Sequence, residues 1–166
     1  MKQKLLISAA TAAAIYIAAP LIELVEGVEN RPYIDIAGVW TICSGITGPD
    51  VVIGKTYSKS ECRALLEKHV AIHSKYVEQA VRYDIHSKTK AALISFSYNV
   101  GGSAMRNSTA IRLINRGEVI KGCKALGMWN KITKNGKKIV VKGLVNRRNI
   151  EIKLCIEGEM EMKRGL

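Results

Sequence analysis

The sequence predicts an α+β fold, with a small β-containing lobe near the front, a larger helical lobe behind it and an apolar helix before both. Three observations lead to this prediction. The chain begins with a long uncharged stretch, residues 33–53 are rich in β-branched residues, aromatics and turn glycines, and helical patterns dominate from residue 58 onward. A length of 166 residues without a repeat or an internal linker suits one compact domain.

The N-terminal stretch has the length of a membrane span. Residues 5–22, Leu5 to Ile22, contain no charged residue, and Lys2 and Lys4 precede them. Eighteen residues are just enough to cross a bilayer as a helix. Positive charge on the N-terminal side favours keeping that end in the cytoplasm and exporting the rest of the chain. We therefore divide the chain into a membrane-inserting segment, 1–23, and the domain that follows it, 24–166.

The composition of this stretch predicts a weak hold in lipid. Alanine dominates it, and Ser8 and Thr11 add hydroxyl groups, so burial in lipid contributes little free energy. This favours a segment that inserts during export and later leaves the bilayer, which is called a signal-arrest-release segment. A permanent anchor and a cleaved signal peptide remain alternatives. Cleavage after Ala19 is disfavoured because Ile17 occupies a position that prefers a small residue.

Local signals place the remaining elements along the chain. We predict a helix over 1–22 and a β-hairpin or small sheet over 33–53. Ser58 and Glu61 form a capping-box pattern that starts a helix over about 59–76, and a second helix runs from Ser87 to near Gly101. Further helices are expected over 109–117, over 119–128 and after Gly143. The residues 131–140 alternate around an Asn-Gly pair, which predicts a hairpin.

Four cysteines occur, and none lies in a C-x-x-C pair, so a zinc ribbon or a redox motif is disfavoured. An even number of cysteines in an exported protein suggests disulfides. Of the three possible pairings, the simplest joins Cys43 to Cys62 and Cys123 to Cys155.

The charge balance predicts an anionic partner. Lys and Arg total 26 against 14 Asp and Glu, a net charge of +12. Nucleic acid, an anionic membrane surface and the acidic cell wall all fit this charge. His69 and His73 have the spacing of a metal pair on a helix, but no H-E-x-x-H motif accompanies them, so a polar helix face is the better interpretation. We expect no metal, no cofactor and no nucleic-acid partner.

Three residues near the front have the chemistry of a glycosidase. Asp35 lies nine residues after Glu26, and Thr41 lies six residues after Asp35. Glycoside hydrolysis requires one carboxyl group that donates a proton and a second that is ionised. Placing one on a helix and the other at a sheet edge gives them different environments. Acidic residues at such spacing are common, so the pair alone is weak evidence.

The surrounding pattern, EGVENRPYIDIAGVWTI from Glu26, resembles the front end of the phage-type lysozymes, glycoside hydrolase family 24. Two further stretches, ALISFSYNVG with STAIRLINRG and GLVNRRNIEIKLC, resemble the helical lobe and the last helix of that family. With its arrest-like N-terminus, the chain is most similar to the lambdoid signal-arrest-release (SAR) endolysins. The resemblance implies a lysozyme-like fold and a monomeric enzyme that cuts the β-1,4 bond between N-acetylmuramic acid and N-acetylglucosamine in peptidoglycan.

The same resemblance assigns roles to the three residues. Glu26 would protonate the leaving oxygen, Asp35 would orient the attacking water or stabilise the oxocarbenium ion, and Thr41 would help to hold that water. Arg147 or Arg148 would supply a cation near the carboxylates. Inversion or retention depends on the separation of the carboxyl groups, which the sequence does not give.

The enzyme would begin in the host inner membrane with its catalytic domain in the periplasm, and become soluble there after release.

One position departs from the family pattern. The family continues after the threonine with a Gly-His-Thr-like run, and Ile46 replaces the histidine here. Activity survives if that histidine only organises the loop, and is reduced if the histidine supports the substrate or Thr41. Two other functions remain open: a lytic transglycosylase, which needs a glutamate but no Asp-Thr water site, and a non-enzymatic, membrane-anchored wall-binding protein.

Overall fold

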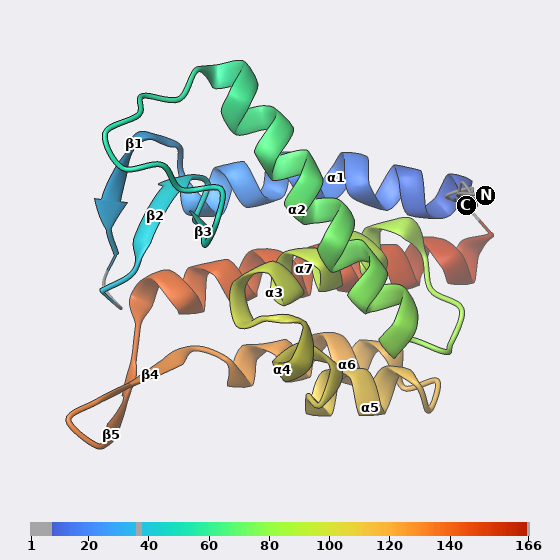
Figure 1. The fold of residues 1–166 in the computed structure, drawn as a ribbon. Coiled ribbons are helices and arrows are strands. Elements are labelled where there is room, and N and C mark those ends of the chain that lie inside the picture. Colours follow the sequence, from blue (N-terminus) through green and yellow to red (C-terminus); the bar gives the residue numbers. More distant parts are fainter. Residues whose placement is uncertain (1–7, 36–37, 166) are drawn as a thin grey trace.

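The computed structural model describes residues 8–35 and 38–165, and it confirms the predicted α+β architecture (Figure 1). The small lobe is a three-stranded antiparallel sheet of order β1-β2-β3, and the helical lobe follows it in sequence. The elements are α1 (Ala9–Glu26), β1 (Glu29–Ile34), β2 (Trp40–Cys43), β3 (Ile46–Thr47), α2 (Lys59–Ala80), α3 (Ser87–Val100), α4 (Gly102–Arg106), α5 (Thr109–Ile114), α6 (Val119–Ala125), the 3₁₀ turn η1 (Leu126–Met128), β4 (Lys131–Lys134), β5 (Lys137–Val140) and α7 (Lys142–Arg164).

Helix α1 has a defined start and a defined end. The Ser8 side chain accepts a hydrogen bond from the Thr11 N–H at 3.2 Å, which satisfies one of the free amides of the first turn. The helix ends at Glu26 because Gly27 adopts a φ of 72°. The predicted boundary at residue 23 lies inside this helix, so the apolar segment and the catalytic domain share one continuous element. Of the predicted helix over 1–22, residues 1–7 lie outside the described residues.

The inner face of α1 belongs to the core of the helical lobe. Ala14, Ala18 and Ile22 are fully buried and pack with residues of α3 and α2. The small side chains of Ala14 and Ala18 let the helix axes approach closely. The outer face stays apolar but uncovered, with Tyr16 78% and Leu24 74% exposed. Among the described helices, α1 alone has the length and apolar composition to cross a membrane.

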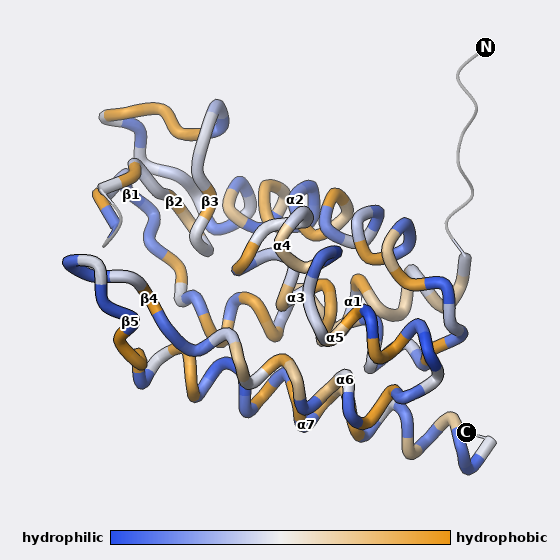
Figure 2. Tube along the Cα trace, turned by 90° about the horizontal axis from the view of Figure 1, so that it is seen from below, coloured by the Kyte–Doolittle hydropathy of each residue, from blue (hydrophilic) through white to orange (hydrophobic). Residues whose placement is uncertain are grey.

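Helix α3 lies at the centre of the helical lobe, and α1, α2 and α7 pack around it. Residues 91–97 are buried without interruption. Helices α2 and α7 instead alternate hydrophilic and hydrophobic residues, as expected of helices with one face in the core (Figure 2). The capping box of Ser58 and Glu61 is present, but α2 continues to Ala80 rather than about Tyr76, because Val77 and Ala80 extend its buried face.

Both disulfides of the simplest pairing are formed. Cys43–Cys62 ties β2 to α2, and Cys123–Cys155 ties α6 to α7. The first lies in a separate small core of the β-lobe together with Ile42, Ile46 and Tyr57.

The β4–β5 hairpin also forms around its predicted turn. Asn135 and Gly136 both have positive φ, 50° and 73°, as a tight two-residue hairpin turn requires. The ribbon extends away from the helices at the same end of the molecule as β1 and β2 (Figure 1). The last three predicted helices need small corrections. Helix α5 ends at Ile114 rather than at residue 117, α6 gives way to the 3₁₀ turn at Leu126, and α7 starts at Lys142, one residue before Gly143.

Candidate active site

Glu26 is the last residue of α1 and points into a cavity. The cavity has a volume of about 500 Å³, and its lining includes Glu26, Asn99, Trp129, Lys131 and Arg147. The Glu26 side chain is 23% exposed, so it is accessible without being fully solvated. The buried inner face of α1 fixes the helix, and therefore fixes where this carboxyl group lies.

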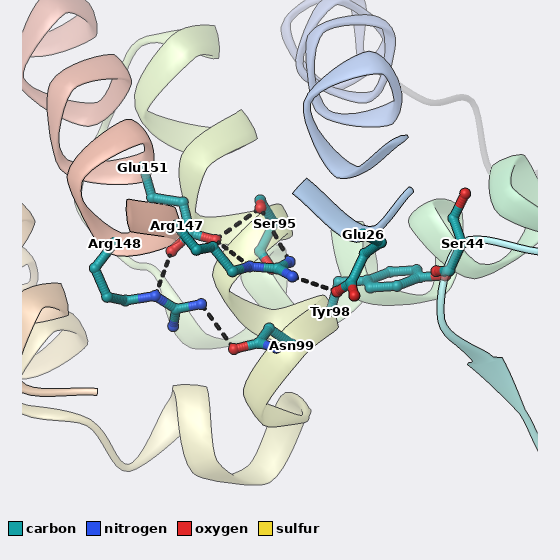
Figure 3. A network of polar contacts seen from close by, with 8 residues as sticks. All are labelled: Glu26, Ser44, Ser95, Tyr98, Asn99, Arg147, Arg148 and Glu151. Atoms are coloured by element: carbon teal, nitrogen blue, oxygen red, sulfur yellow. Dashed lines mark hydrogen bonds and ion pairs between the residues drawn. The ribbon is translucent and has the colours of Figure 1, made fainter. Parts of the chain in front are cut away.

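Arg147 on α7 contacts Glu26 directly, and the two residues are 121 positions apart (Figure 3). The guanidinium is buried, and its other nitrogens are held within the protein. Nε donates to Glu151 Oε1 at 3.0 Å, and Nη2 donates to the Ser95 carbonyl oxygen at 3.0 Å. Arg147 thus places a cation beside the Glu26 carboxyl group, as expected of one arginine of the pair. Arg148 turns away from Glu26 and donates to Asn99 Oδ1 at 2.7 Å.

The turn between β2 and β3 closes the other side of Glu26. Gly45 has a φ of +77°, and a Cβ atom there would lie 3.3 Å from Glu26 Oε2. The Tyr98 hydroxyl donates to the Ser44 carbonyl oxygen at 2.9 Å and so holds this turn (Figure 3). Burial raises the pKa of Tyr98, and the negative charge of Glu26 raises it further, so the phenol keeps the proton that it donates.

Asp35 and Thr41 lie in the β-lobe, where the backbone of Val39 connects them. The Val39 N–H donates to Asp35 Oδ1 at 2.9 Å. The Thr41 hydroxyl donates to the Val39 carbonyl oxygen at 3.0 Å. Asp35 is half-buried just after β1, whereas Thr41 is buried on the central strand β2. Val39 therefore fixes the positions of both side chains relative to one another.

Tyr33 relates the β-lobe carboxylate to Glu26. Burial raises the pKa of Tyr33, and the negative charges of Glu26 and Asp35 raise it further. Both carboxylates thus lie within electrostatic reach of one phenol. Thr41 lies beside the same phenol, because Tyr33 pairs with Thr41 across β1 and β2. Glu26 lies on the helical side of this arrangement, and Asp35 and Thr41 lie on the sheet side.

Ile46, which replaces the family histidine, faces the core of the β-lobe. It is almost completely buried and packs in the cluster that contains Ile42 and Tyr57. Ile46 therefore organises the turn that carries Gly45 and does not line the Glu26 cavity.

The two histidines of α2 do not converge on a common site. His69 Nε2 lies 2.9 Å from Asp50 Oδ2, and His73 Nδ1 lies 2.8 Å from Ser97 Oγ. The prediction of a polar helix face is wrong for His73, which is packed between α2 and α3 beside Tyr76 and Tyr98. Burial lowers the pKa of His73 to about 4, with a smaller contribution from His69.

Several residues around Glu26 could not be singled out from the sequence. Gly45, Tyr98 and Asn99 carry no recognisable catalytic motif of their own, although Tyr98 and Asn99 lie in the family-like stretch ALISFSYNVG. Glu151 is one of many charged residues on the last helix, and it was not among the residues predicted from the sequence. Its signal was its spacing, because it lies four residues after Arg147 and three after Arg148.

Comparisons with known proteins agree with this geometry. The family profile described as Phage lysozyme matches residues 23–151. The SAR-endolysin of Enterobacteria phage PA-2 is 44% identical over 134 residues, covering 81% of this chain and 79% of that protein. The endolysin from Escherichia coli O157:H7 phage FAHEc1 superposes with a TM-score of 0.79 at 29% identity, covering 95% of this chain and 97% of that one. The active form of the P1 phage endolysin Lyz gives 0.75 at 25% identity, covering 92% and 96%. The chain belongs to the phage lysozyme family.

Proposed function

We propose that this lysozyme cuts the β-1,4 bond between N-acetylmuramic acid and N-acetylglucosamine, with Glu26 as the general acid and with Asp35 and Thr41 placing the water. The observation that carries this assignment is the position of Glu26. It ends a helix fixed in the core, contacts a buried guanidinium, and opens onto a cavity large enough for part of a glycan strand.

Arg147 stabilises the negative charge that Glu26 acquires when it transfers its proton. Protonating the leaving oxygen turns the Glu26 carboxyl group into a carboxylate. Arg147 contacts Oε1 and stabilises the charge that appears at that moment. Gly45 packs beside Oε2 and fixes the plane of the carboxyl group.

The sheet side supplies the water. The Thr41 hydroxyl donates its hydrogen bond to the Val39 carbonyl oxygen. The lone pairs of the Thr41 oxygen are therefore left to accept a hydrogen bond from water. Asp35, oriented by the Val39 N–H, polarises the same water or stabilises the oxocarbenium ion. Peptidoglycan is the substrate, and the excess of basic side chains attracts this acidic polymer.

The test is clearing of outer-membrane-permeabilised Gram-negative cells by the purified, oxidised chain. We expect Glu26→Gln to abolish clearing, Thr41→Val to lower the rate by about 100-fold, and Glu29→Gln, three residues from Glu26, to clear normally. Products that end in a reducing sugar identify hydrolysis, and anhydro-sugar ends identify lytic transglycosylation instead. Clearing by Glu26→Gln at the parental rate would overturn the assignment.

Membrane release supplies the control of activity. While residues 5–22 lie in the host inner membrane, with the N-terminus in the cytoplasm, α1 is missing from the core that positions Glu26. Release lets the Ala14–Ala18–Ile22 face dock and completes the site in the periplasm, where the monomer is soluble.

A chain held in the bilayer tests this proposal. Replacing the exposed alanines Ala9, Ala12 and Ala13 by leucine strengthens the span without touching the core. We expect membrane retention together with a loss of clearing. Full muralytic activity in the retained form would contradict control by release.

A further inference from the structure

A cluster of buried charges lies behind the catalytic cavity (Figure 3). Glu151 is 0% exposed and Arg148 is 1% exposed, and both lie on α7 beside Arg147. Of the three, the chemistry proposed above uses only Arg147. Three charged groups are costly to take out of water unless each is paired, so the arrangement of Glu151 and Arg148 needs its own explanation.

Glu151 holds both arginines with its two oxygens. Oε1 accepts from Arg147 Nε at 3.0 Å and from Ser95 Oγ at 2.7 Å. Oε2 lies 3.0 Å from Arg148 Nε and forms an ion pair with it. The i+4 and i+3 spacings on α7 direct the two guanidiniums to opposite sides of one carboxylate.

The contacts of Arg147 determine which of its nitrogens reaches Glu26. Nε is taken by Glu151, and Nη2 donates to the carbonyl oxygen of Ser95. Nη1 is left to contact Glu26. Without the Glu151 carboxylate, the guanidinium would lose the partner that sets its rotation about the side chain.

Arg148 connects Glu151 to the wall of the cavity. Its Nη2 donates to Asn99 Oδ1 at 2.7 Å, and Asn99 lines the cavity that contains Glu26. Within the described residues, Nη1 of Arg148 has no hydrogen-bond partner, and the Phe96 ring lies 5.0 Å from the guanidinium carbon. Glu151 is therefore the anion that balances Arg148.

The net positive charge that faces Glu26 depends on whether Glu151 is ionised. Arg147 and Arg148 act on Glu26 from α7, while Tyr98 on α3, Tyr33 on β1 and Lys131 on β4, which lines the same cavity, face it from the other elements. With Glu151 ionised, the two arginines and Glu151 together present one net positive charge to Glu26. With Glu151 neutral, they present two.

We propose that Glu151 is a positioning residue for catalysis: it orients Arg147 onto Glu26 and neutralises one of the two guanidiniums, so that a single net positive charge meets Glu26 when it gives up its proton. This inference rests on the proposed role of Glu26 as general acid. An excess positive charge beside Glu26 would favour its carboxylate and remove the proton too early.

The experiment compares Glu151→Gln with Glu159→Gln. Glu159 is also a buried glutamate on α7 with a basic i+4 partner, Lys163, but it lies at the other end of the helix from Glu26. The rate of clearing is measured from pH 4 to 9, beside circular dichroism and thermal melting. We expect Glu151→Gln to fold, to clear at least about tenfold more slowly at neutral pH, and to move the alkaline limb of its profile about one unit lower. Glu159→Gln should leave the limb in place.

A charge-balanced double variant separates electrostatics from structure. Glu151→Gln with Arg148→Gln restores one net positive charge beside Glu26, so its alkaline limb should return to the parental position even if its rate stays low. An unmoved limb in folded Glu151→Gln would overturn the proposal. If the single variant does not fold, a lowered limb in the double variant overturns it. Glu26→Gln is included in the same series, because activity in that variant refutes the general-acid assignment itself, whatever Glu151 does.

Discussion

The backbone of Gly45 packs against one side of the Glu26 carboxyl group. A Cβ atom at Gly45 would lie 3.3 Å from both Cδ and Oε2 of Glu26, closer than a relaxed contact allows. The φ of +77° also disfavours any other residue. The turn that carries Gly45 is thus shaped to meet Glu26.

Gly45→Ala should therefore lower activity by more than its cost in stability explains. We expect a loss of about 1 kcal/mol of unfolding free energy from the positive φ, together with a clear loss of clearing activity. Gly54→Ala is the matched control, because Gly54 has a φ of +85° and no neighbour within 4 Å of a built Cβ. Equal activity of the two variants under conditions where both are folded would show that contact with Glu26 has no catalytic consequence.

Removal of the first disulfide should lower activity more than removal of the second. Each closes a loop, of 19 and 32 residues by sequence separation, and the removal of either should lower stability by about 3 kcal/mol. Replacing Cys43 and Cys62 by alanine frees the turn that leads to Gly45, so we expect slower clearing by the folded protein. Replacing Cys123 and Cys155 affects only the α6–α7 contact. Urea unfolding and clearing at 20 °C measure both effects, and a larger activity loss in the second variant would contradict this reasoning.

Stability should fall on mild acidification because of His73. Burial lowers its pKa to about 4, against 6.5 for an unperturbed histidine. Between these two values the unfolded chain binds a proton that the folded protein does not, so unfolding becomes easier as the pH falls from 6.5 toward 4. The full shift sets an upper limit of about 3 kcal/mol, and the solvent that still reaches the ring reduces it to about 1–2 kcal/mol.

Urea titrations at pH 7.5 and pH 5 measure the effect of His73. His73→Gln cannot take up this proton and should show a correspondingly smaller difference between the two pH values. The same difference in parent and variant would assign the acid sensitivity to other groups.

Leucine at an inner alanine of α1 should block docking, whereas leucine on the outer face should not. Ala18 is fully buried against the core, and Ala13 is exposed. Both Ala18→Leu and Ala13→Leu raise the apolar content of the span equally. Overpacking at Ala18 should cost about 1–3 kcal/mol in the folded state. We expect less folded, active enzyme from Ala18→Leu than from Ala13→Leu at equal expression, measured in membrane and soluble fractions. Equal yields would mean that α1 does not dock as described.

Local patterns predicted much of this fold. The Asn135-Gly136 turn and the capping box at Ser58 follow from backbone requirements within a few residues. Gly27 carries another such signal, which the predicted helix end at residue 22 did not use: it stops α1 directly after Glu26 and so sets the position of the carboxyl group.

Long-range contacts left no comparable signal. The pairing of Glu26 with Arg147 joins residues at opposite ends of the chain, and no periodicity records it. The docking of α1 was hidden for a related reason. A helix that is apolar on all sides has no hydrophobic period, so its sequence does not show which side faces a core. The division at residue 23 stays a prediction for the membrane-bound state.

The buried and the exposed side of α1 should differ in how many substitutions they tolerate. Each buried alanine is fixed by the space beside α3, so selection for an earlier or later onset of lysis has little room to act there. Exposed positions such as Tyr16 and Leu24 lie outside that core. Under the proposed control by release, changes at those positions would alter how long the span stays in the bilayer while leaving the finished enzyme intact. Lineages under different lysis schedules should therefore diverge along the outer side of α1 and stay alike along the inner one.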